Sequence, residues 1–232
     1  MVGSGIAAQQ LSPHDVGLQL LENSLATVFG LAALILMLGP VSGAHFNPVV
    51  SLADWFLGRR SGTGLTLAEV GAYAVAQIVG GIGGAVLANV MFEVDQAIST
   101  KDRTGSGHLV AEVVATAGLV ALIFALVRSD RGALAAPAVG GYIGAAYWFT
   151  SSTSFANPAV TAGRIFSDTV AGIAPGSVPG FVGAQLVGLV VGVLLVLVLY
   201  PEGGPKRARS DEISGSSDQD DAVGQRIPRQ PR

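Results

Sequence analysis

The 232-residue sequence contains no cysteine, which excludes disulfide bonds, thiol chemistry and thiolate metal sites. It is also poor in charge, because Asp, Glu, Lys and Arg make up 12% of the residues, about half the share of an ordinary soluble domain. Lys and Arg number 13 against 16 acidic residues, and this balance excludes nucleic acid as a partner. The three histidines show no metal-ligand spacing, and we expect neither a metal nor a cofactor.

The few charges are unevenly distributed along the chain. Residues 1–200 hold only 17 of them, too few to cover a water-facing surface, and we predict that this part lies in a lipid bilayer. The last 32 residues hold 12 charges and many Gly, Pro and Ser residues. That composition predicts a disordered tail over residues 201–232.

Five uncharged apolar stretches are each close to the roughly 20 residues that cross a bilayer as a helix. They cover residues 24–41, 70–92, 113–127, 132–150 and 181–200. Extending the third stretch back to His108 places Glu112 inside a span. Seven of the ten basic residues near span ends fall on the side of the C-terminus if the spans alternate. The positive-inside rule then predicts an inner-membrane protein with a cytoplasmic C-terminus.

Two shorter apolar segments begin with Asn-Pro, in the sequences SGAHFNPVVSLADW and STSFANPAVTAGRIF, and their asparagines are 110 residues apart. The pattern Gln-x-x-Gly-x-x-x-Gly follows each segment, from Gln77 and from Gln185, with an offset of 108. Its glycines are spaced for close helix packing in lipid. The shared offset predicts a duplication, with repeats of about 1–92 and 108–200. A unit of three spans places its copy upside down, so we expect inverted repeats.

Each Asn-Pro segment carries the N-cap Asn and the first-turn Pro of a short helix, which we expect to stop near mid-membrane. Inversion then brings two helix N-termini together, each with about half a positive charge. Such a pair would repel cations and protons while neutral solutes pass. The amide N–H groups of Asn47 and Asn157 can donate to a water or hydroxyl oxygen, which would interrupt a proton-conducting chain of hydrogen bonds.

These paired boxes in a duplicated apolar chain resemble the aquaporin and aquaglyceroporin (major intrinsic protein) family, over roughly residues 1–200. The boxes consist of Asn47, Pro48 and Val49, and of Asn157, Pro158 and Ala159. The resemblance implies an all-α membrane protein, a six-helix bundle of two inverted repeats with two re-entrant half-helices. It also implies a homotetramer with a pore in each subunit for water and small neutral solutes. Val49 in place of alanine is a small apolar change from which we expect little effect.

The family's selectivity filter usually includes an arginine directly after the second box, where this sequence has Val160. Arg164 lies one helical turn further on and is not expected to replace it. The other filter positions, carried over by spacing from the two asparagines, are Thr27, Ala145 and Ser154. This ring is neither aromatic nor charged, and it resembles bacterial aquaporins associated with arsenic resistance. The resemblance implies passage of arsenite, other neutral metalloid hydroxides and arsenicals, and glycerol-like polyols.

The first span is incomplete in this sequence. Its apolar part, residues 2–8, is too short to cross a bilayer. It resembles the outer half of the family's first helix, so the inner half would lie upstream of Met1. We therefore predict a truncation or a native start upstream of Met1, which the intact mass of the native protein tests.

Four further polar residues have structural interpretations. We interpret His45 as a re-entrant loop residue bonded to backbone, because no second histidine lies at ligand spacing. The resemblance implies that Glu112 is a buried acceptor that supports the re-entrant loops. Asp54 and Arg164, each seven residues after an Asn, are interpreted as tethers of the half-helix ends rather than solute contacts.

Two other function classes, an enzyme and a secondary active transporter, compete with a passive pore. Neither a Gly-x-Ser-x-Gly nor a His-Glu-x-x-His motif is present, and we expect no enzyme activity. A secondary active transporter also uses inverted repeats and broken helices, but it needs ionisable residues inside the membrane for ion coupling. Glu112 is the one such residue, with Glu22 and Glu69 near span ends. This transporter and a water-selective channel remain the alternatives.

Overall fold

The computed structural model describes residues 1–59 and 61–201, and the regular structure in this part of the chain is entirely helical. The predicted disordered tail over 201–232 lies outside the described residues, apart from Pro201. The helices are α1 (Val2–Leu11), α2 (Val16–Ser42), α3 (Pro48–Gly58), α4 (Leu67–Met91), α5 (Ser106–Arg128), α6 (Ala135–Phe149), α7 (Pro158–Gly163) and α8 (Val178–Leu199). Short 3-10 turns cover Gly132–Leu134, Arg164–Phe166 and Pro175–Ser177.

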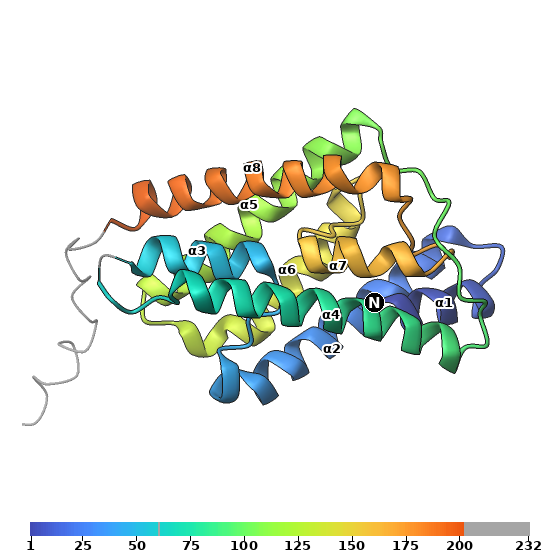
Figure 1. Ribbon diagram of the computed structural model, residues 1–232, viewed down its shortest axis with the longest axis horizontal. Helices are drawn as coiled ribbons and strands as arrows, with labels where there is room; N and C mark the ends of the chain where they lie inside the picture. Colours follow the sequence, from blue (N-terminus) through green and yellow to red (C-terminus); the bar gives the residue numbers. More distant parts are fainter. Residues whose placement is uncertain (60, 202–232) are drawn as a thin grey trace, which may run out of the picture. The chain divides into compact units, whose positions relative to one another are not determined.

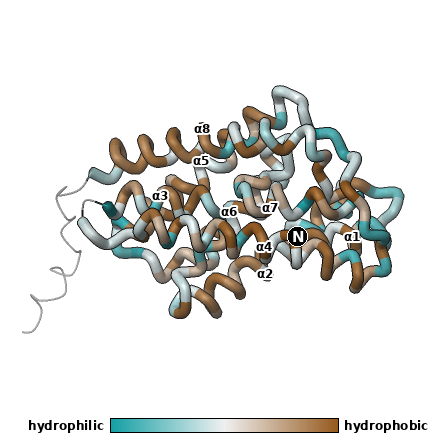
Figure 2. The backbone as a smooth tube through the Cα atoms, viewed as in Figure 1, coloured by the Kyte–Doolittle hydropathy of each residue, from teal (hydrophilic) through white to brown (hydrophobic). Residues whose placement is uncertain are grey.

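Four helical segments of the described chain are long and apolar enough to cross a membrane: Val16–Ser42, Leu67–Met91, Ser106–Arg128 and Pro175–Leu199. α6 has 15 residues and continues a 3-10 turn that starts at Gly132. Large apolar side chains are exposed along these helices, including Leu36, Val79 and Val198, as expected of faces in contact with lipid. Figure 2 shows that the residues of these helices are largely hydrophobic. The predicted all-α membrane fold is therefore confirmed.

α3 and α7 are the two half-helices, and each begins directly after an asparagine in extended conformation, with proline at its first position. They extend from the middle of the bundle in opposite directions in Figure 1, α3 beside the C-terminal end of α8 and α7 beside α4. α7 has only six residues before a 3-10 turn, shorter than the expected ten or so. Its end packs backbone to backbone on α4, since a Cβ at Gly163 would lie 2.5 Å from the carbonyl oxygen of Gly81.

α1 is the shortest helix outside the two half-helices. Its 10 residues give about 15 Å of rise, half of what a hydrocarbon core requires. It starts in the middle of the bundle (Figure 1) and buries Ile6 and Ala8 completely or nearly so. α1 is thus a partial span, as expected from the apolar residues 2–8, and the start of the native chain stays a prediction.

Glycine packing differs between the two repeated helices, α4 and α8. A Cβ at Gly188 of α8 would lie 2.7 Å from the Thr116 side chain and from a backbone oxygen of α5, and Gly192 is equally close. These glycines therefore allow the close approach that their spacing predicted. Their counterparts Gly80 and Gly84 in α4 have nothing within 4 Å of a Cβ. The predicted close packing is corrected for α4, because no helix of the described chain lies against that stripe.

Candidate functional site

The two boxes meet in the middle of the bundle and are bonded to each other. The Asn47 side-chain amide donates to the backbone oxygen of Ala156 at 2.7 Å, and the Asn157 amide donates to that of Phe46 at 2.8 Å. Each asparagine thus bonds the residue that precedes the other asparagine. This reciprocal pattern is the local signature of a two-fold pseudo-symmetry, and it fixes the ends of both half-helices.

The same two asparagines cap their own helices. The Asn47 side-chain oxygen accepts from the backbone N–H of Val49 at 3.1 Å, and the Asn157 oxygen accepts from Ala159 at 2.9 Å and Val160 at 3.3 Å. An asparagine amide has two N–H donors, and the cross-repeat bond uses one of them. Both asparagines line the central cavity, so the second donor is available to a solute oxygen there.

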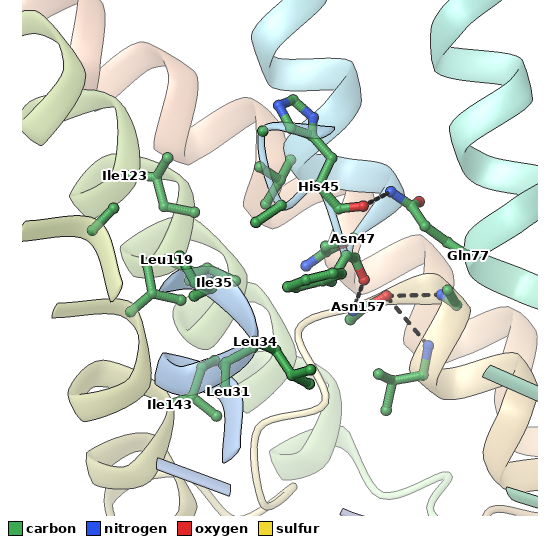
Figure 3. A pocket seen from close by; sticks show the side chains of 18 of the residues that line it. Leu31, Leu34, Ile35, His45, Asn47, Gln77, Leu119, Ile123, Ile143 and Asn157 are labelled. Atoms are coloured by element: carbon green, nitrogen blue, oxygen red, sulfur yellow. Dashed lines mark hydrogen bonds between the residues drawn. The ribbon is translucent and has the colours of Figure 1, made fainter. Parts of the chain in front are cut away.

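The central cavity has a volume of about 840 Å³ and two chemically different walls. The polar wall carries His45, Asn47, Gln77 and Asn157 (Figure 3). The opposite wall is apolar and comes from α2, α5 and α6, with Leu31, Leu34, Ile35, Leu119, Ile123 and Ile143. A solute with hydroxyl groups on one side and an apolar surface on the other matches such a lumen.

Glu112 is completely buried and organises the segment before the second box. One carboxylate oxygen accepts from the Ser152 hydroxyl at 2.6 Å and the Phe155 N–H at 2.9 Å. The other accepts from the Ala156 N–H at 2.8 Å and the Gln185 side chain at 2.7 Å. Four donors satisfy the charge that burial would otherwise penalise. The carboxylate therefore holds a strained loop, in which Ser154 and Ala156 have positive φ.

The segment before the first box is held differently. The Gln77 side chain donates to the backbone oxygen of His45 and, at 3.2 Å, to the Ser51 hydroxyl, while Nδ1 of His45 lies 3.2 Å from the same hydroxyl. The Tyr73 ring packs against His45 with centroids 5.4 Å apart. No carboxylate of the described chain bonds this segment, and the side-chain oxygen of Gln77 is buried without a partner there.

The residues predicted to form the selectivity filter divide into two groups. Thr27 and Val160 line the cavity, as expected. Ser154 is completely buried, its hydroxyl finds no partner among the described residues, and it is not part of the lining. Ala145 is exposed and also outside the lining. The filter is corrected at Ala145 because each helical residue turns by about 100°, which puts it opposite the lining residue Ile143.

A cluster that the sequence did not predict lies beside Thr27. It consists of Thr27, Tyr147, Phe155 and Arg164, and we call it the Thr27 cluster. The Tyr147 hydroxyl is 3.3 Å from the Thr27 hydroxyl and accepts from the Arg164 guanidinium at 3.4 Å. That guanidinium lies 4.0 Å above the centre of the Phe155 ring. Helical periodicity was the available signal, since Tyr147 follows Ile143, and Arg164 follows Val160, by four residues.

Arg103, in the segment between α4 and α5, also lies over the Phe155 ring, at 4.9 Å from its centre. Its guanidinium donates to the backbone oxygens of Gly172 at 2.9 Å, Val170 at 3.2 Å and Ser152 at 3.3 Å. Burial, with the nearby Arg164 charge, lowers the pKa of Arg103 to about 10. Arg103 therefore stays charged at neutral pH.

Comparisons with known proteins agree with this geometry. The family model "Major intrinsic protein" matches residues 1–156. Aquaglyceroporin AqpS of Rhizobium meliloti is 47% identical over 206 residues, which cover 88% of this chain and 85% of that protein. Probable aquaporin AqpM of Archaeoglobus fulgidus is 30% identical over 194 residues, which cover 76% of this chain and 73% of that protein. Aquaporin-2 of Rattus norvegicus is 28% identical over 231 residues, which cover 92% of this chain and 79% of that protein.

The similarity thus extends over most of the chain, and both boxes have the reciprocal bonds and caps described above. No group of three or more His, Asp or Glu side chains in the described part of the chain could hold a metal ion. The family consists of channels rather than enzymes. The chain belongs to the major intrinsic protein family, and it is an integral membrane protein that forms a passive channel for water and small neutral solutes.

Proposed function

We propose that this channel passes compact neutral polyhydroxy solutes, namely arsenite in its neutral form, other metalloid hydroxides and arsenicals, and glycerol-like polyols, together with water. The two-walled cavity is the observation that carries the proposal. Hydroxyl groups can accept from the free amide donors of Asn47 and Asn157, while the opposite side of the solute contacts the leucine and isoleucine wall. Water alone gains nothing from such an apolar wall.

The lining at the level of Thr27 and Val160 also supports a solute larger than water. Both side chains are small and line the cavity where a strict water channel of the family narrows with an aromatic residue and an arginine. The similarity to a protein named an aquaglyceroporin points the same way. A water-selective channel remains the second candidate, because Phe155 also lines the cavity near this level and could narrow it.

The setting of the channel is part of the proposal. We infer a homotetramer in the inner membrane, with one pore in each subunit and the C-terminus in the cytoplasm. The exposed apolar faces of the spans leave room for contacts with lipid and with other subunits. Chemical crosslinking of the purified protein, and labelling of a cysteine introduced after residue 201, test these two inferences separately.

The substitution Val160→Arg tests the solute class. An arginine at this lining position should narrow the passage. We expect arsenite and glycerol flux into proteoliposomes to fall about tenfold or more relative to water flux, which corresponds to a rise of about 1.4 kcal/mol in their barrier. Val160→Leu, which adds bulk without charge, is the matched control and should reduce glycerol less. Unchanged arsenite and glycerol flux in Val160→Arg would mean that the selective constriction lies elsewhere.

A further inference from the structure

Asp54 is the only charged side chain among the described residues that line the central cavity. It lies in α3, seven residues after Asn47, which places it about 10 Å further along the helix axis. The corresponding residue after the second box is Arg164, which is 2% exposed and is not part of the lining. Equivalent positions of the two repeats therefore carry opposite charges, and the negative one lies at the lumen.

Only one oxygen of the Asp54 carboxylate is bonded within the described chain. Oδ2 accepts from the Leu65 backbone N–H at 2.8 Å, which agrees with the tethering role expected from the sequence. Oδ1 is not among the buried atoms that lack a partner, so it is open to the cavity that Asp54 lines. The bond to the loop thus fixes the side chain, and the second oxygen remains available to solutes.

The charge of this carboxylate is not neutralised by a neighbouring cation of the described chain. The arginine nearest in sequence among the described residues is Arg59, whose guanidinium lies over the Trp55 and Phe56 rings, 5.4 and 4.3 Å from their centres. His45 also lines the cavity, but burial opposes a charge on its imidazole, although the Asp54 carboxylate favours one. Asp54 therefore contributes a full negative charge to the α3 end of the lumen.

The centre and the α7 end of the lumen are positive by contrast. The two half-helix N-termini meet at the centre, and each carries about half a positive charge. The buried guanidiniums of Arg103 and Arg164 lie over Phe155, which lines the cavity, and the one buried carboxylate nearby is Glu112. Such a potential repels cations but attracts anions. The half-helices therefore do not account for the exclusion of anions, which needs a negative group.

We propose that Asp54 determines the charge selectivity of the channel by excluding anions at the α3 end of the lumen. Its carboxylate raises the barrier for an anion, whereas a neutral solute is not repelled and can donate a hydroxyl hydrogen to the open oxygen. Neutral arsenite and polyols then pass, and halides and deprotonated oxyanions do not. The inference rests on the proposed channel function, and it gives Asp54 a role at the lumen in addition to the tether.

Proteoliposomes with Asp54→Asn test the proposal, because asparagine can still accept from the Leu65 N–H but carries no charge. Three fluxes are measured on one preparation: osmotic water flux, glycerol flux and bromide influx, the last by quenching of an entrapped halide-sensitive dye. We expect the bromide-to-water ratio to rise on the order of tenfold, since a unit charge a few ångströms from the path is removed. The glycerol-to-water ratio should stay the same, because glycerol is neutral.

Two further variants serve as controls for this measurement. Asp54→Glu retains the charge and should keep the bromide-to-water ratio low. Asp95→Asn removes a carboxylate from an exposed position outside the cavity lining, and it should change neither ratio.

A second experiment changes the charge after the protein has folded. The chain contains no cysteine, so Asp54→Cys has a single thiol. Its reaction with 2-sulfonatoethyl methanethiosulfonate restores a negative charge, and its reaction with 2-(trimethylammonio)ethyl methanethiosulfonate adds a positive charge of similar bulk. We expect the bromide-to-water ratio of the positive product to exceed that of the negative product on the order of tenfold or more.

An unchanged bromide-to-water ratio in Asp54→Asn would overturn the inference. So would an equal rise in the bromide and glycerol ratios, because that result indicates a wider passage rather than a lost charge. Equal bromide-to-water ratios for the two Asp54→Cys products, or loss of water flux in Asp54→Asn, Asp54→Glu and Asp54→Cys alike, would also contradict it. Absence of water and glycerol flux in the unchanged protein would instead contradict the proposed channel function itself.

Discussion

The two repeats share their boxes but differ in what supports them. In the second repeat, Glu112 accepts four hydrogen bonds and ties the segment before the box to Gln185. In the first repeat, no carboxylate of the described chain bonds the corresponding segment, and the Gln77 side chain donates to the His45 backbone oxygen. The glycines that follow show the same difference, since Gly188 is packed on α5 while Gly80 faces open space.

The geometry of each box therefore does not depend on how the segment before it is supported. Box geometry comes from contacts within a few residues of each asparagine and from the reciprocal bonds between the two, which are alike in both repeats. Support comes from the first span of each repeat. This span is complete in the second repeat, where it is α5, and only ten residues long in the first, where it is α1. We therefore expect the stability of the second repeat to depend far more on its spans.

The largest difference between the repeats should come from Glu112→Ala. Its removal leaves buried N–H and hydroxyl donors without an acceptor, and we expect a loss on the order of 3 kcal/mol or more. Thermal unfolding in detergent, followed by the fluorescence of Trp55 and Trp148, measures it. Gln77→Ala removes the side chain that bonds the segment before the first box, and it should cost clearly less. Glu93→Ala, in an exposed loop, serves as the control. Equal losses of stability for Glu112→Ala and Gln77→Ala would contradict the difference in support between the two repeats.

A smaller difference is expected from alanine at equivalent glycines. In Gly188→Ala the new methyl group would lie 2.7 Å from atoms of α5, and we expect about 1–3 kcal/mol of destabilisation from overpacking. Gly80→Ala has nothing within 4 Å and should be neutral or gain up to about 1 kcal/mol from helix propensity. The two unfolding midpoints should therefore move in different directions, and a large loss in Gly80→Ala would show that a partner covers that stripe.

The smallest difference should be between Asn47→Ala and Asn157→Ala. Each removes one N-cap and one cross-repeat bond, worth about 1 kcal/mol apiece. Because the bonds are reciprocal and of similar length, we expect the two losses to agree closely and the double variant to lose less than their sum. Independent, fully additive losses would indicate that the two boxes are not coupled through these bonds.

Much of this architecture could be predicted from the sequence because its signals are local or repeated. The boxes are N-caps followed by proline, and their offset of 110 residues establishes the duplication. The spans follow from apolar length, although α2 begins eight residues before the expected Ser24 because Asp15 caps it. The role of Glu112 was implied by the family resemblance, and the bonds that its carboxylate accepts from the Phe155 and Ala156 N–H groups agree with it.

The other features of the site could not be predicted because they depend on the direction of side chains. Residue spacing transferred from the family does not give that direction. Ala145 was assigned by counting back from Asn157, but α6 presents Ile143 and Tyr147 on its inner face instead. The position of the Arg164 guanidinium, 4.0 Å above the Phe155 ring, likewise depends on side-chain direction and not on residue spacing. The packing of Gly80 could not be foreseen because it depends on a neighbouring helix rather than on the glycine pattern.

Stopped-flow light scattering of proteoliposomes in a glycerol gradient tests the central claim, a passive lumen between the two boxes, most directly. The claim predicts swelling that follows the gradient in either direction, rises linearly with glycerol concentration and depends only weakly on temperature. It also predicts no change when sodium or proton gradients are imposed or removed. Saturable uptake that requires an ion gradient would contradict it, and would favour the inverted-repeat transporter instead.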